Sequence, residues 1–384
     1  MTKTPRRIDA LDALRGIVMI LMALDHVRDF FHRGAMSFSP TDLTKTTPII
    51  FFTRWVTHFC LPTFMFTAGA GAFLWWHHGK RTKNQLAQFL TTRGIWFIFL
   101  ELTVMQFSYN FNFSAQNRIL LLVLWIFGLC MIFMSALIWL PPRMLAAVSV
   151  AGIVMHNLLD RVPIPVWLFL HQPGVFRFAG RAWLVAYPLL PWVMVMTAGF
   201  CFGQVLLLEP RRRQTILLRT GLGLTIAFFV LRIVNVYGDP SPRTGGILSF
   251  LNCTKNPPSL EYLLMTLGPA LIALSVLDRL SFHFRSPLIV FGRVPLFYFV
   301  VHFFVIHAVL VLMCWVRYGN AAFTFVFHPE PSLGGPAGLF PSDFGYRLRT
   351  VYGVWIVILA LLYPLCVWFS RFKSRHSYWW LRYL

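Results

Sequence analysis

Hydrophobic residues in this chain gather into long runs, which are separated by shorter stretches rich in charged residues, proline and glycine. A bilayer core needs about 20 consecutive apolar residues per helix, and most of the runs reach that length. We find no internal repeat, no low-complexity linker and no separate soluble segment. The pattern therefore predicts a single all-α polytopic membrane domain over residues 1–384. Its roughly ten helices are expected at 11–31, 49–76, 86–107, 118–140, 143–159, 183–208, 214–236, 259–280, 288–315 and 350–370.

Lysine and arginine cluster in alternate connections between these runs and at both ends of the chain. Such loops are retained on the cytoplasmic side in most membrane proteins, so the clusters mark one side as cytoplasmic. An even number of spans returns the chain to its starting side, and both termini are therefore predicted to be cytoplasmic. The clusters are Lys3, Arg6 and Arg7; Lys80, Arg81 and Lys83; Arg143; Arg211, Arg212 and Arg213; Arg279 and Arg285; and Arg371, Lys373 and Arg375.

The composition supports a lipid environment and narrows the partners. Of the 384 residues, 57% are hydrophobic and only 12% are charged, about half the charge of a typical soluble protein. The 34 basic and 13 acidic residues give a net charge of +21, which in a soluble protein would suggest nucleic acid. The apolar runs exclude that partner and favour the lipid bilayer instead. The six cysteines lack metal-ligand or redox spacing, so no metal is expected.

The first predicted helix carries an unusual number of charged side chains. Each charge inside a span costs a few kcal/mol on insertion scales, so the helix must face protein or a water-filled cavity. One stripe of it, at 100° per residue, holds Asp12, Arg15, Met19, Met22, His26 and Asp29. His26 is a candidate general base, because the unperturbed pKa of histidine is near neutral. Asp25 or Asp29 would orient its ring. The alternative is structural: Asp12 pairs with Arg15, and His26 to Asp29 form an interfacial turn.

Further polar groups lie in four other regions of the chain. Arg54 and His58 share a face of the second span, and Arg93 lies in the third. The segment 249–262 contains Asn252 and Lys255 and then Pro257-Pro258, which interrupts the backbone at a membrane boundary. Such a segment is tolerated where it is buried in protein or lines a cavity, so Lys255 is a candidate for stabilising charge. In the ninth span, Tyr298 and His302 share one face. For each group a structural role is the alternative.

Four sequence blocks carry a resemblance to a known family. The first, LDALRGIVMILMALDH, contains Leu-Arg-Gly and the spacing Arg15-x10-His26; the others are SFLNCTKNPPSLEYLLMTLGPA (249–270), FGRVPLFYFVVH (291–302) and WWLRYL (379–384). In this order they resemble the transmembrane acyltransferase superfamily. That group includes the acyltransferase-3 O-acetylases and the heparan-alpha-glucosaminide N-acetyltransferases, and the chain most resembles bacterial relatives of the latter.

The resemblance implies an activity, a donor and a location. Acetyl-CoA or another acyl-CoA would bind from the cytoplasm, and the acyl group would pass to a hydroxyl or amine of an extracytoplasmic acceptor, a glycan or a small molecule. The bacterial inner membrane is the expected site. His26 takes the position of the essential histidine, with Asp25 and Asp29 beside it. His32 is the nearest residue to an acyl-accepting histidine that follows this helix in the N-acetyltransferases, so direct transfer and an acyl-histidine intermediate both stay open.

Binding roles are assigned on the same basis. Arg15, Arg54 and Arg93 are predicted to bind the CoA donor, whose phosphates need cationic partners. Lys255, Asn252, Tyr298 and His302 are predicted to bind the acceptor. A homodimer is also considered.

Two other function classes are weighed. A secondary transporter of a small polar or anionic substrate would show internal repeats and paired broken helices, whereas only one broken segment is found. A b-type haem carrier is suggested by His26, His58, His302 and His307, which all lie within predicted spans.

Overall fold

This computed structural model describes residues 8–114, 118–161, 167–241, 243–329, 332 and 337–383. The basic cluster Lys3, Arg6 and Arg7 lies outside these residues. The chain is mostly helical, and helices occupy each of the ten ranges expected from the sequence. Among the described residues, six helical stretches are long and apolar enough to cross a bilayer, and two shorter apolar helices accompany them. The structure is thus that of a helical membrane protein, while the number of spans and their orientation stay predictions.

The α-helices are α1 (Asp9–Phe31), α2 (Pro48–Trp55), α3 (Cys60–His78), α4 (Lys83–Leu100), α5 (Gln106–Asn110), α6 (Val123–Leu137), α7 (Pro142–Met155), α8 (Trp167–Leu170), α9 (Trp192–Phe202), α10 (Pro210–Val234), α11 (Gly246–Leu251), α12 (Leu260–Leu277), α13 (Pro287–Arg293), α14 (Pro295–Tyr318) and α15 (Leu348–Arg375). Short 3-10 turns are η1 (Arg33–Met36), η2 (Val56–Phe59), η4 (His156–Arg161), η5 (Val205–Leu207), η6 (Gly319–Thr324), η8 (Ala337–Leu339) and η9 (Trp379–Arg382), and η3 (Glu101–Met105) is a π-helical turn.

The predicted second helix is broken into α2 and α3 by the turn η2. Pro62, in the first turn of α3, has no N–H to donate to the carbonyl of His58. The hydroxyl of Tyr262, from α12, donates to that carbonyl instead at 2.8 Å. The break therefore exchanges a local hydrogen bond for one that joins two distant parts of the chain.

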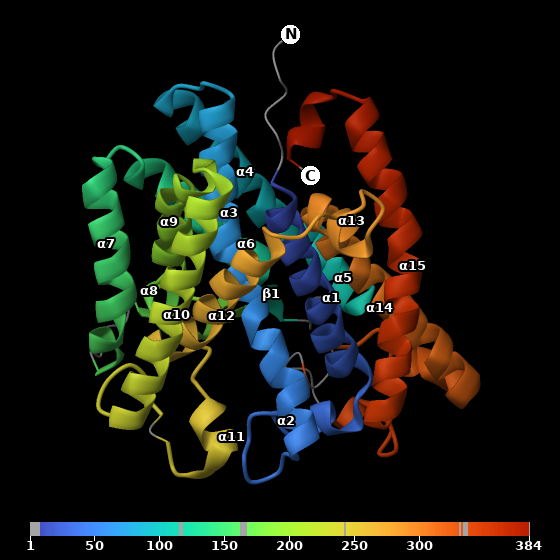
Figure 1. The fold of residues 1–384 in the computed structure, drawn as a ribbon. Coiled ribbons are helices and arrows are strands. Elements are labelled where there is room, and N and C mark those ends of the chain that lie inside the picture. The colour runs from blue at the N-terminus through green and yellow to red at the C-terminus, as the bar shows by residue number, and fades with distance from the viewer. Residues whose placement is uncertain are drawn as a thin grey trace.

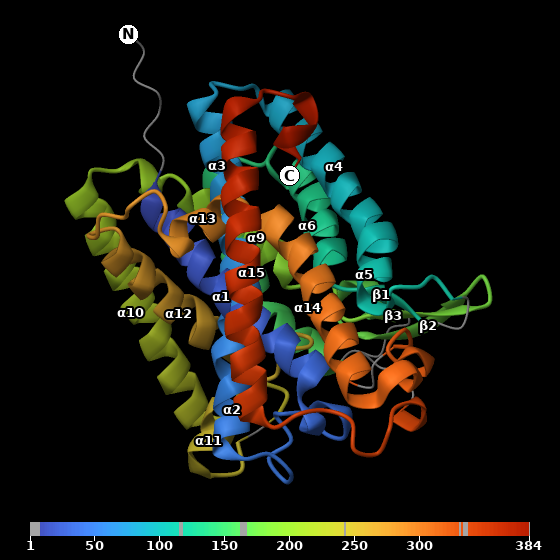
Figure 2. The same ribbon diagram turned by 90° about the vertical axis from the view of Figure 1, so that its right-hand side faces the viewer.

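The all-α expectation is wrong in one region, where three short strands form a sheet in the order β1-β3-β2. β1 (Ile119–Leu121) runs parallel to β3 (Arg181–Val185), with Ile119 opposite Trp183, and β2 (Gly174–Phe178) pairs with β3 as an antiparallel hairpin. The range 183–208 expected as helix therefore begins with a strand. Figure 2 shows the hairpin extending sideways beyond the helices, away from the end at which α1 begins.

α1 lies at the centre of the helix arrangement and contacts α3, α12, α13, α14 and α15 (Figure 1). Around it, α10 packs along α12, α3 along α9 and α4 along α6. The start of α1 and the end of α15 lie at the same end of the molecule. This agrees with termini on one side, and we refer to this end as the N-terminal end of α1.

Candidate functional site

Four charged side chains meet at the C-terminal half of α1. The guanidinium of Arg28, which is 2% exposed, donates to an oxygen of Asp25 at 3.0 Å and to an oxygen of Asp29 at 2.6 Å. Arg54, from α2, donates to the other oxygen of Asp25. Two carboxylates and two guanidinium groups thus balance one another in a largely buried network, and Asp25 is fixed from both sides.

His26 lies beside this network without being hydrogen-bonded to it. Its Nδ1 is buried without a hydrogen-bond partner, 4.0 Å from an oxygen of Asp29, and its side chain is 20% exposed. The ring centroid lies 4.4 Å from that of Phe303 and 5.2 Å from that of His302. The imidazole is therefore held between aromatic rings of α14 and carboxylates of α1, with part of its surface open.

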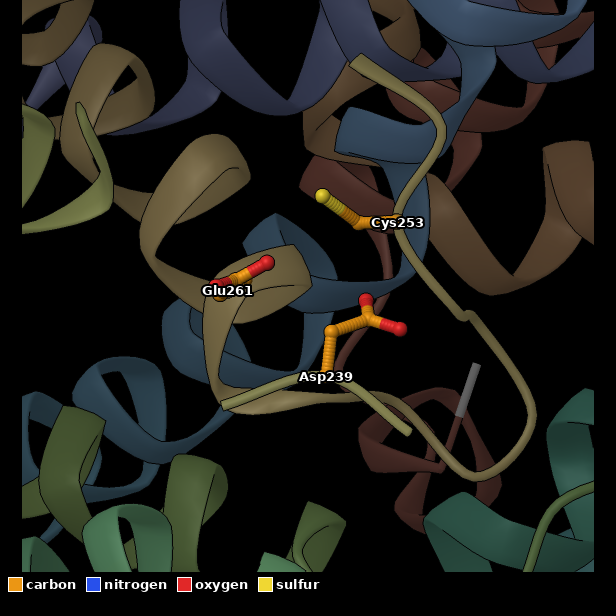
Figure 3. Close-up of side chains that lie close together, drawn as sticks. All are labelled: Asp239, Cys253 and Glu261. Atoms are coloured by element: carbon orange, nitrogen blue, oxygen red, sulfur yellow. The ribbon is translucent and has the colours of Figure 1, made fainter. Parts of the chain in front are cut away.

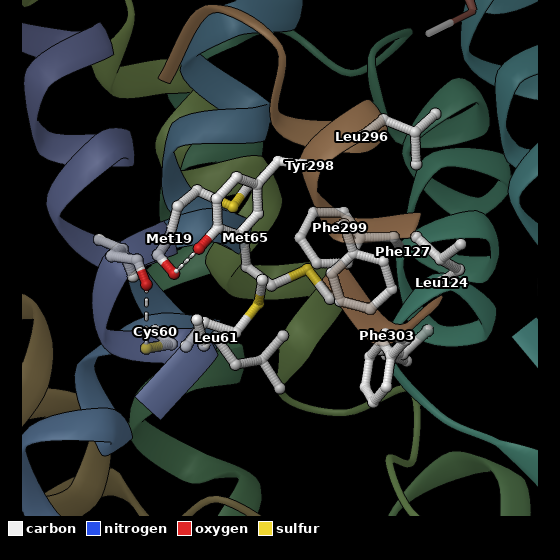
Figure 4. Close-up of a cluster of buried hydrophobic side chains, with 14 of the residues drawn as sticks. Met19, Cys60, Leu61, Met65, Leu124, Phe127, Leu296, Tyr298, Phe299 and Phe303 are labelled. Carbon is white, nitrogen blue, oxygen red and sulfur yellow. Dashed lines mark hydrogen bonds between the residues drawn. The ribbon is translucent and has the colours of Figure 1, made fainter. Parts of the chain in front are cut away.

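The two predicted acceptor-binding residues of α14 have different surroundings. The hydroxyl of Tyr298 is buried and donates to the backbone carbonyl of Met19 at 3.0 Å, which ties α14 to α1 (Figure 4). Nδ1 of His302 lies 2.6 Å from the carbonyl oxygen of Phe299, so it carries the proton and donates. Nε2 of His302 is left as an acceptor without a partner. Of the pair, His302 is the one brought to His26.

The side chain of Arg232, in α10, fixes the backbone of residues 249–252 by hydrogen bonds. Two predicted acceptor-binding residues, Asn252 and Lys255, lie in or just after this stretch. Arg232 is 1% exposed, pairs with Glu261 at 2.7 Å and donates to the carbonyl oxygens of Phe250, Ser249 and Asn252 at 2.9, 2.8 and 3.1 Å. The side-chain amide of Asn252 donates to the carbonyl of Thr41 at 3.1 Å, so Asn252 joins two connecting segments.

Lys255 follows in this segment and is half-buried, with its Nζ 5.9 Å from the ring centre of Tyr187. Burial and the nearby positive charge of Arg54 lower the pKa of Lys255 to about 8. Lys255 therefore belongs to the same group of charges as Asp25, Arg54 and His26. The sequence identified Lys255 but gave no sign that α2 would bring Arg54 to it.

Two buried arginines, Arg28 and Arg232, have no role assigned to them in the sequence analysis. Arg28 lies three residues after Asp25, a spacing that favours ion pairs on a helix, and this signal could have identified it. Arg232 lies near the end of the apolar run 214–236, and a charged residue so deep within an expected span is a signal of a buried partner. His58 is 2% exposed, packs on Tyr262 with ring centroids 5.4 Å apart, and neither of its ring nitrogens has a hydrogen-bond partner.

A cavity of about 270 Å³ lies beside the N-terminal half of α1 and is lined by two of the three arginines assigned to the donor. Arg15 donates to the carbonyl of Thr67 at 2.5 Å and occupies the space left by Gly71, where a Cβ would lie 2.9 Å from its guanidinium. Arg93 lies 5.2 Å from the ring centre of Phe97. A neighbouring hollow of about 560 Å³ shares Arg15, Gly71 and Trp75 with the cavity and adds His78 and Arg81. Arg54 lines neither of them.

An apolar layer separates the cavity from His26. Met19 and Phe299 line the inner wall of the cavity, and Phe303 lies between Phe299 and His26, with ring centroids 5.8 and 4.4 Å apart. Figure 4 shows these side chains within one buried cluster with Leu124 and Phe127 of α6. Met19 precedes His26 by two helical turns, about 10 Å along the axis. A donor in the cavity would thus point its far end at His26.

One group of side chains has the composition of a metal site. Ligand atoms of Asp239, Cys253 and Glu261 lie within 4.8 Å of one another, converging from three segments of chain (Figure 3). Asp239 already accepts hydrogen bonds from the amides of Ser241 and Thr254 and from the hydroxyls of Thr254 and Ser259, all at 2.7 or 2.8 Å. Glu261 is paired with Arg232. The carboxylates of this group hold the loop that leads into α12.

Three of the histidines considered as haem ligands, His26, His302 and His307, contact other groups in the structure. Both ring nitrogens of His307 lie within hydrogen-bond distance of carbonyl oxygens, at 3.1 Å from Ser108 and 2.9 Å from Val326. His26 and His302 contact each other directly. Axial ligands must face each other across the macrocycle, and this pair leaves no space for one.

A comparison of the sequence with models of known protein families gives a match. The model of the catalytic domain of heparan-alpha-glucosaminide N-acetyltransferase matches residues 7–231, more than half of the chain. The match contains Arg15, His26, Arg54 and Arg93, whereas Lys255 and His302 lie beyond it. No curated protein matches the sequence. Because the family match covers more than half of the chain, the chain belongs to the heparan-alpha-glucosaminide N-acetyltransferase catalytic family, a family whose members are acetyltransferases.

Proposed function

We propose that the protein transfers an acetyl or other short acyl group from cytoplasmic acyl-CoA to a hydroxyl or amine of an extracytoplasmic acceptor, with His26 as general base. The observation that carries the proposal is the alignment of the arginine-lined cavity, the apolar layer and His26 along α1. Family membership supports acetyl-CoA as the donor, and we place the protein in a bacterial inner membrane on the resemblance alone.

The donor fits the cavity by charge and polarity. The hollow lined by His78, Arg81 and Arg15 offers cations for the phosphates of CoA. The cavity beyond it is lined mainly by apolar side chains and suits the pantetheine arm. For the thioester to reach His26, the acyl end of the donor would have to pass Phe299 and Met19, and the small volume there favours a short acyl group.

The chemical step needs one base and one site for negative charge. His26 takes the proton of the acceptor hydroxyl or amine as the acceptor attacks the thioester carbon. The carbon–sulfur bond then breaks, and the thiolate leaves as free CoA after receiving the proton from His26. Asp25 and Asp29 stabilise the imidazolium that forms in between. Lys255 stabilises negative charge on the acyl oxygen, and the free Nε2 of His302 accepts a hydrogen bond from the acceptor.

The first experiment measures calorimetric binding of acetyl-CoA to the purified protein. Arg15→Gln and Arg93→Gln are expected to weaken binding by about tenfold each, since each removes a charge-assisted contact. Arg143→Gln, at an exposed position of α7, is the matched control and should bind as the wild type does. Equal binding by all four proteins would place the donor elsewhere. Transport of a polar solute without acyl-CoA binding would instead favour the transporter.

A second experiment tests the base. His26→Asn keeps the size and polarity of the side chain but cannot take a proton, and we expect acetyl transfer to fall by about 100-fold or more. Acetyl-CoA binding should be unchanged, because His26 does not line the cavity. His283→Asn, in an exposed loop, is the control. Transfer is measured with glucosamine and with glucose in vesicles of known orientation, which separates N- from O-transfer. Wild-type transfer by His26→Asn would contradict the assignment.

A further inference from the structure

A second concave surface lies on the outer flank of α15, far from His26 along the chain and outside the donor cavity. This α15 groove, of about 620 Å³, is lined by Arg285, Tyr363, Pro364, Val367, Trp368, Arg371, Phe372, Arg375 and His376. None of these lining residues carries a carboxylate. Three guanidinium groups therefore gather at one hollow without an acidic side chain among its walls.

The groove is held in shape by contacts between two segments. The hydroxyl of Tyr363 donates at 2.8 Å to the backbone carbonyl of Arg285, which fixes the connection between α12 and α13 against α15. Trp368, Phe372 and His376 stack in sequence along α15, with ring centroids 5.9 and 4.4 Å apart. The groove is thus lined by Arg285 from the connection between α12 and α13, and by arginines and aromatic rings from the C-terminal part of α15.

The position of the groove along α15 indicates which kind of anion the three arginines would bind. Arg371 and Arg375 lie on the face of α15 that carries Trp368 and, toward the other end, Leu365, Leu361 and Val357, which are 40–59% exposed together with Trp368. These apolar side chains belong to a predicted span, so lipid covers them. The cations lie at the end of that face which the sequence assigns to the cytoplasm, where tryptophan and arginine meet lipid headgroups.

We propose that the α15 groove binds the phosphate of an anionic phospholipid headgroup, while the acyl chains of the same lipid lie along the exposed apolar face of α15. Arg285, Arg371 and Arg375 supply the charge, and Trp368 lies at the level of the ester groups. Free phosphates such as those of CoA share the headgroup chemistry but have no acyl chains for the apolar face. The proposal does not depend on the acyl-transfer activity.

The test uses the purified full chain and counts bound lipid by native mass spectrometry, with dioleoyl phosphatidylglycerol and dioleoyl phosphatidylcholine as probes. We expect the wild type to retain phosphatidylglycerol in preference to phosphatidylcholine, and excess CoA not to displace it. The double variant Arg371→Gln/Arg375→Gln should bind phosphatidylglycerol about 25-fold more weakly, since each surface charge contributes roughly a factor of five.

Arg211→Gln/Arg212→Gln is the matched control, because it removes the same charge from exposed positions at the start of α10. It should retain the lipid as the wild type does. Arg285→Gln, in an exposed connection, tests the other segment that lines the groove if the double variant does not fold. Equal retention of both lipids by the wild type, equal loss in the Arg211/Arg212 control, or displacement by CoA would each overturn the proposal.

Discussion

Lys255 is a cation near His26 whose charge can change close to neutral pH, because burial and Arg54 lower its pKa to about 8. If its ammonium group stabilises the acyl oxygen, acetyl transfer should fall as the pH rises through 8. Lys255→Arg keeps the charge at every accessible pH, so the alkaline loss should move upward by more than a pH unit. Lys255→Met should lower the rate below pH 8, where the wild-type amine is charged, and should remove this alkaline loss. The measurement is kcat/KM against pH for the three proteins.

The loss of activity at alkaline pH can be distinguished from unfolding, because the contribution of Lys255 to stability changes with pH in the opposite direction. The pKa of Lys255 in the folded protein lies below the ordinary value of 10.5, so the charged form is disfavoured by folding. The contribution of Lys255 to stability therefore improves as the pH rises through 8 toward 10.5. An alkaline loss of activity through Lys255 would thus occur while its unfavourable contribution to stability is diminishing. An identical alkaline limb in wild type and Lys255→Arg would contradict the assignment.

The sequence predicted which side chains face inward better than it predicted their partners. Helical periodicity placed Asp12, Met19 and His26 on one stripe, and the structure buries Asp12 and Met19 and gives His26 contacts with α14. The same periodicity grouped Tyr298 with His302, yet the hydroxyl of Tyr298 is bonded to the backbone of α1. Spacing fixes the face of a helix, whereas the partner atom belongs to another segment and is not encoded locally.

The crossing of α1 and α13 depends on two glycines. A Cβ at Gly16 would lie 1.9 Å from the carbonyl oxygen of Leu288, and one at Gly292 would lie 1.8 Å from that of Asp12. Both contacts involve backbone, so the helices would have to separate. We expect Gly16→Ala to destabilise the protein by about 1–3 kcal/mol or more and to lower its Tm in detergent. Gly223→Ala, in α10, has no neighbour within 4 Å of the new Cβ and serves as the control. Equal Tm values for both variants would contradict close packing at this crossing.

Boundaries of elements were predictable where the cause is local and not where it is distant. The apolar runs located helices in all ten ranges, since length and hydropathy are properties of a short segment. The break at Pro62 is stabilised by Tyr262, some 200 residues later. Among the described strands, β1 pairs only with β3, more than 60 residues later in the chain, and such parallel pairing leaves little trace in either strand alone.

In the proposed mechanism, the donor and the base lie along one axis of the molecule. The cavity with Arg15 and Arg93 lies beside the N-terminal half of α1, and the network of Asp25 and Arg54 lies beyond the apolar layer. An acyl group that reaches His26 has already crossed that layer. This arrangement explains how a donor on one side could serve an acceptor on the other without the donor itself crossing the membrane.

Filling the cavity should block this route while leaving the base intact. Ala68, in α3, lines the 270 Å³ cavity, so the indole of Ala68→Trp would occupy much of the space proposed for the pantetheine arm. We expect acetyl-CoA binding by calorimetry to fall by about tenfold or more, and acetyl transfer to fall with it. Ala147→Trp, at an exposed position of α7, adds the same side chain outside the cavity and should leave both unchanged. If Ala68→Trp folds with wild-type Tm and still binds acetyl-CoA normally, the donor does not use this cavity, and His26 must receive it by another path.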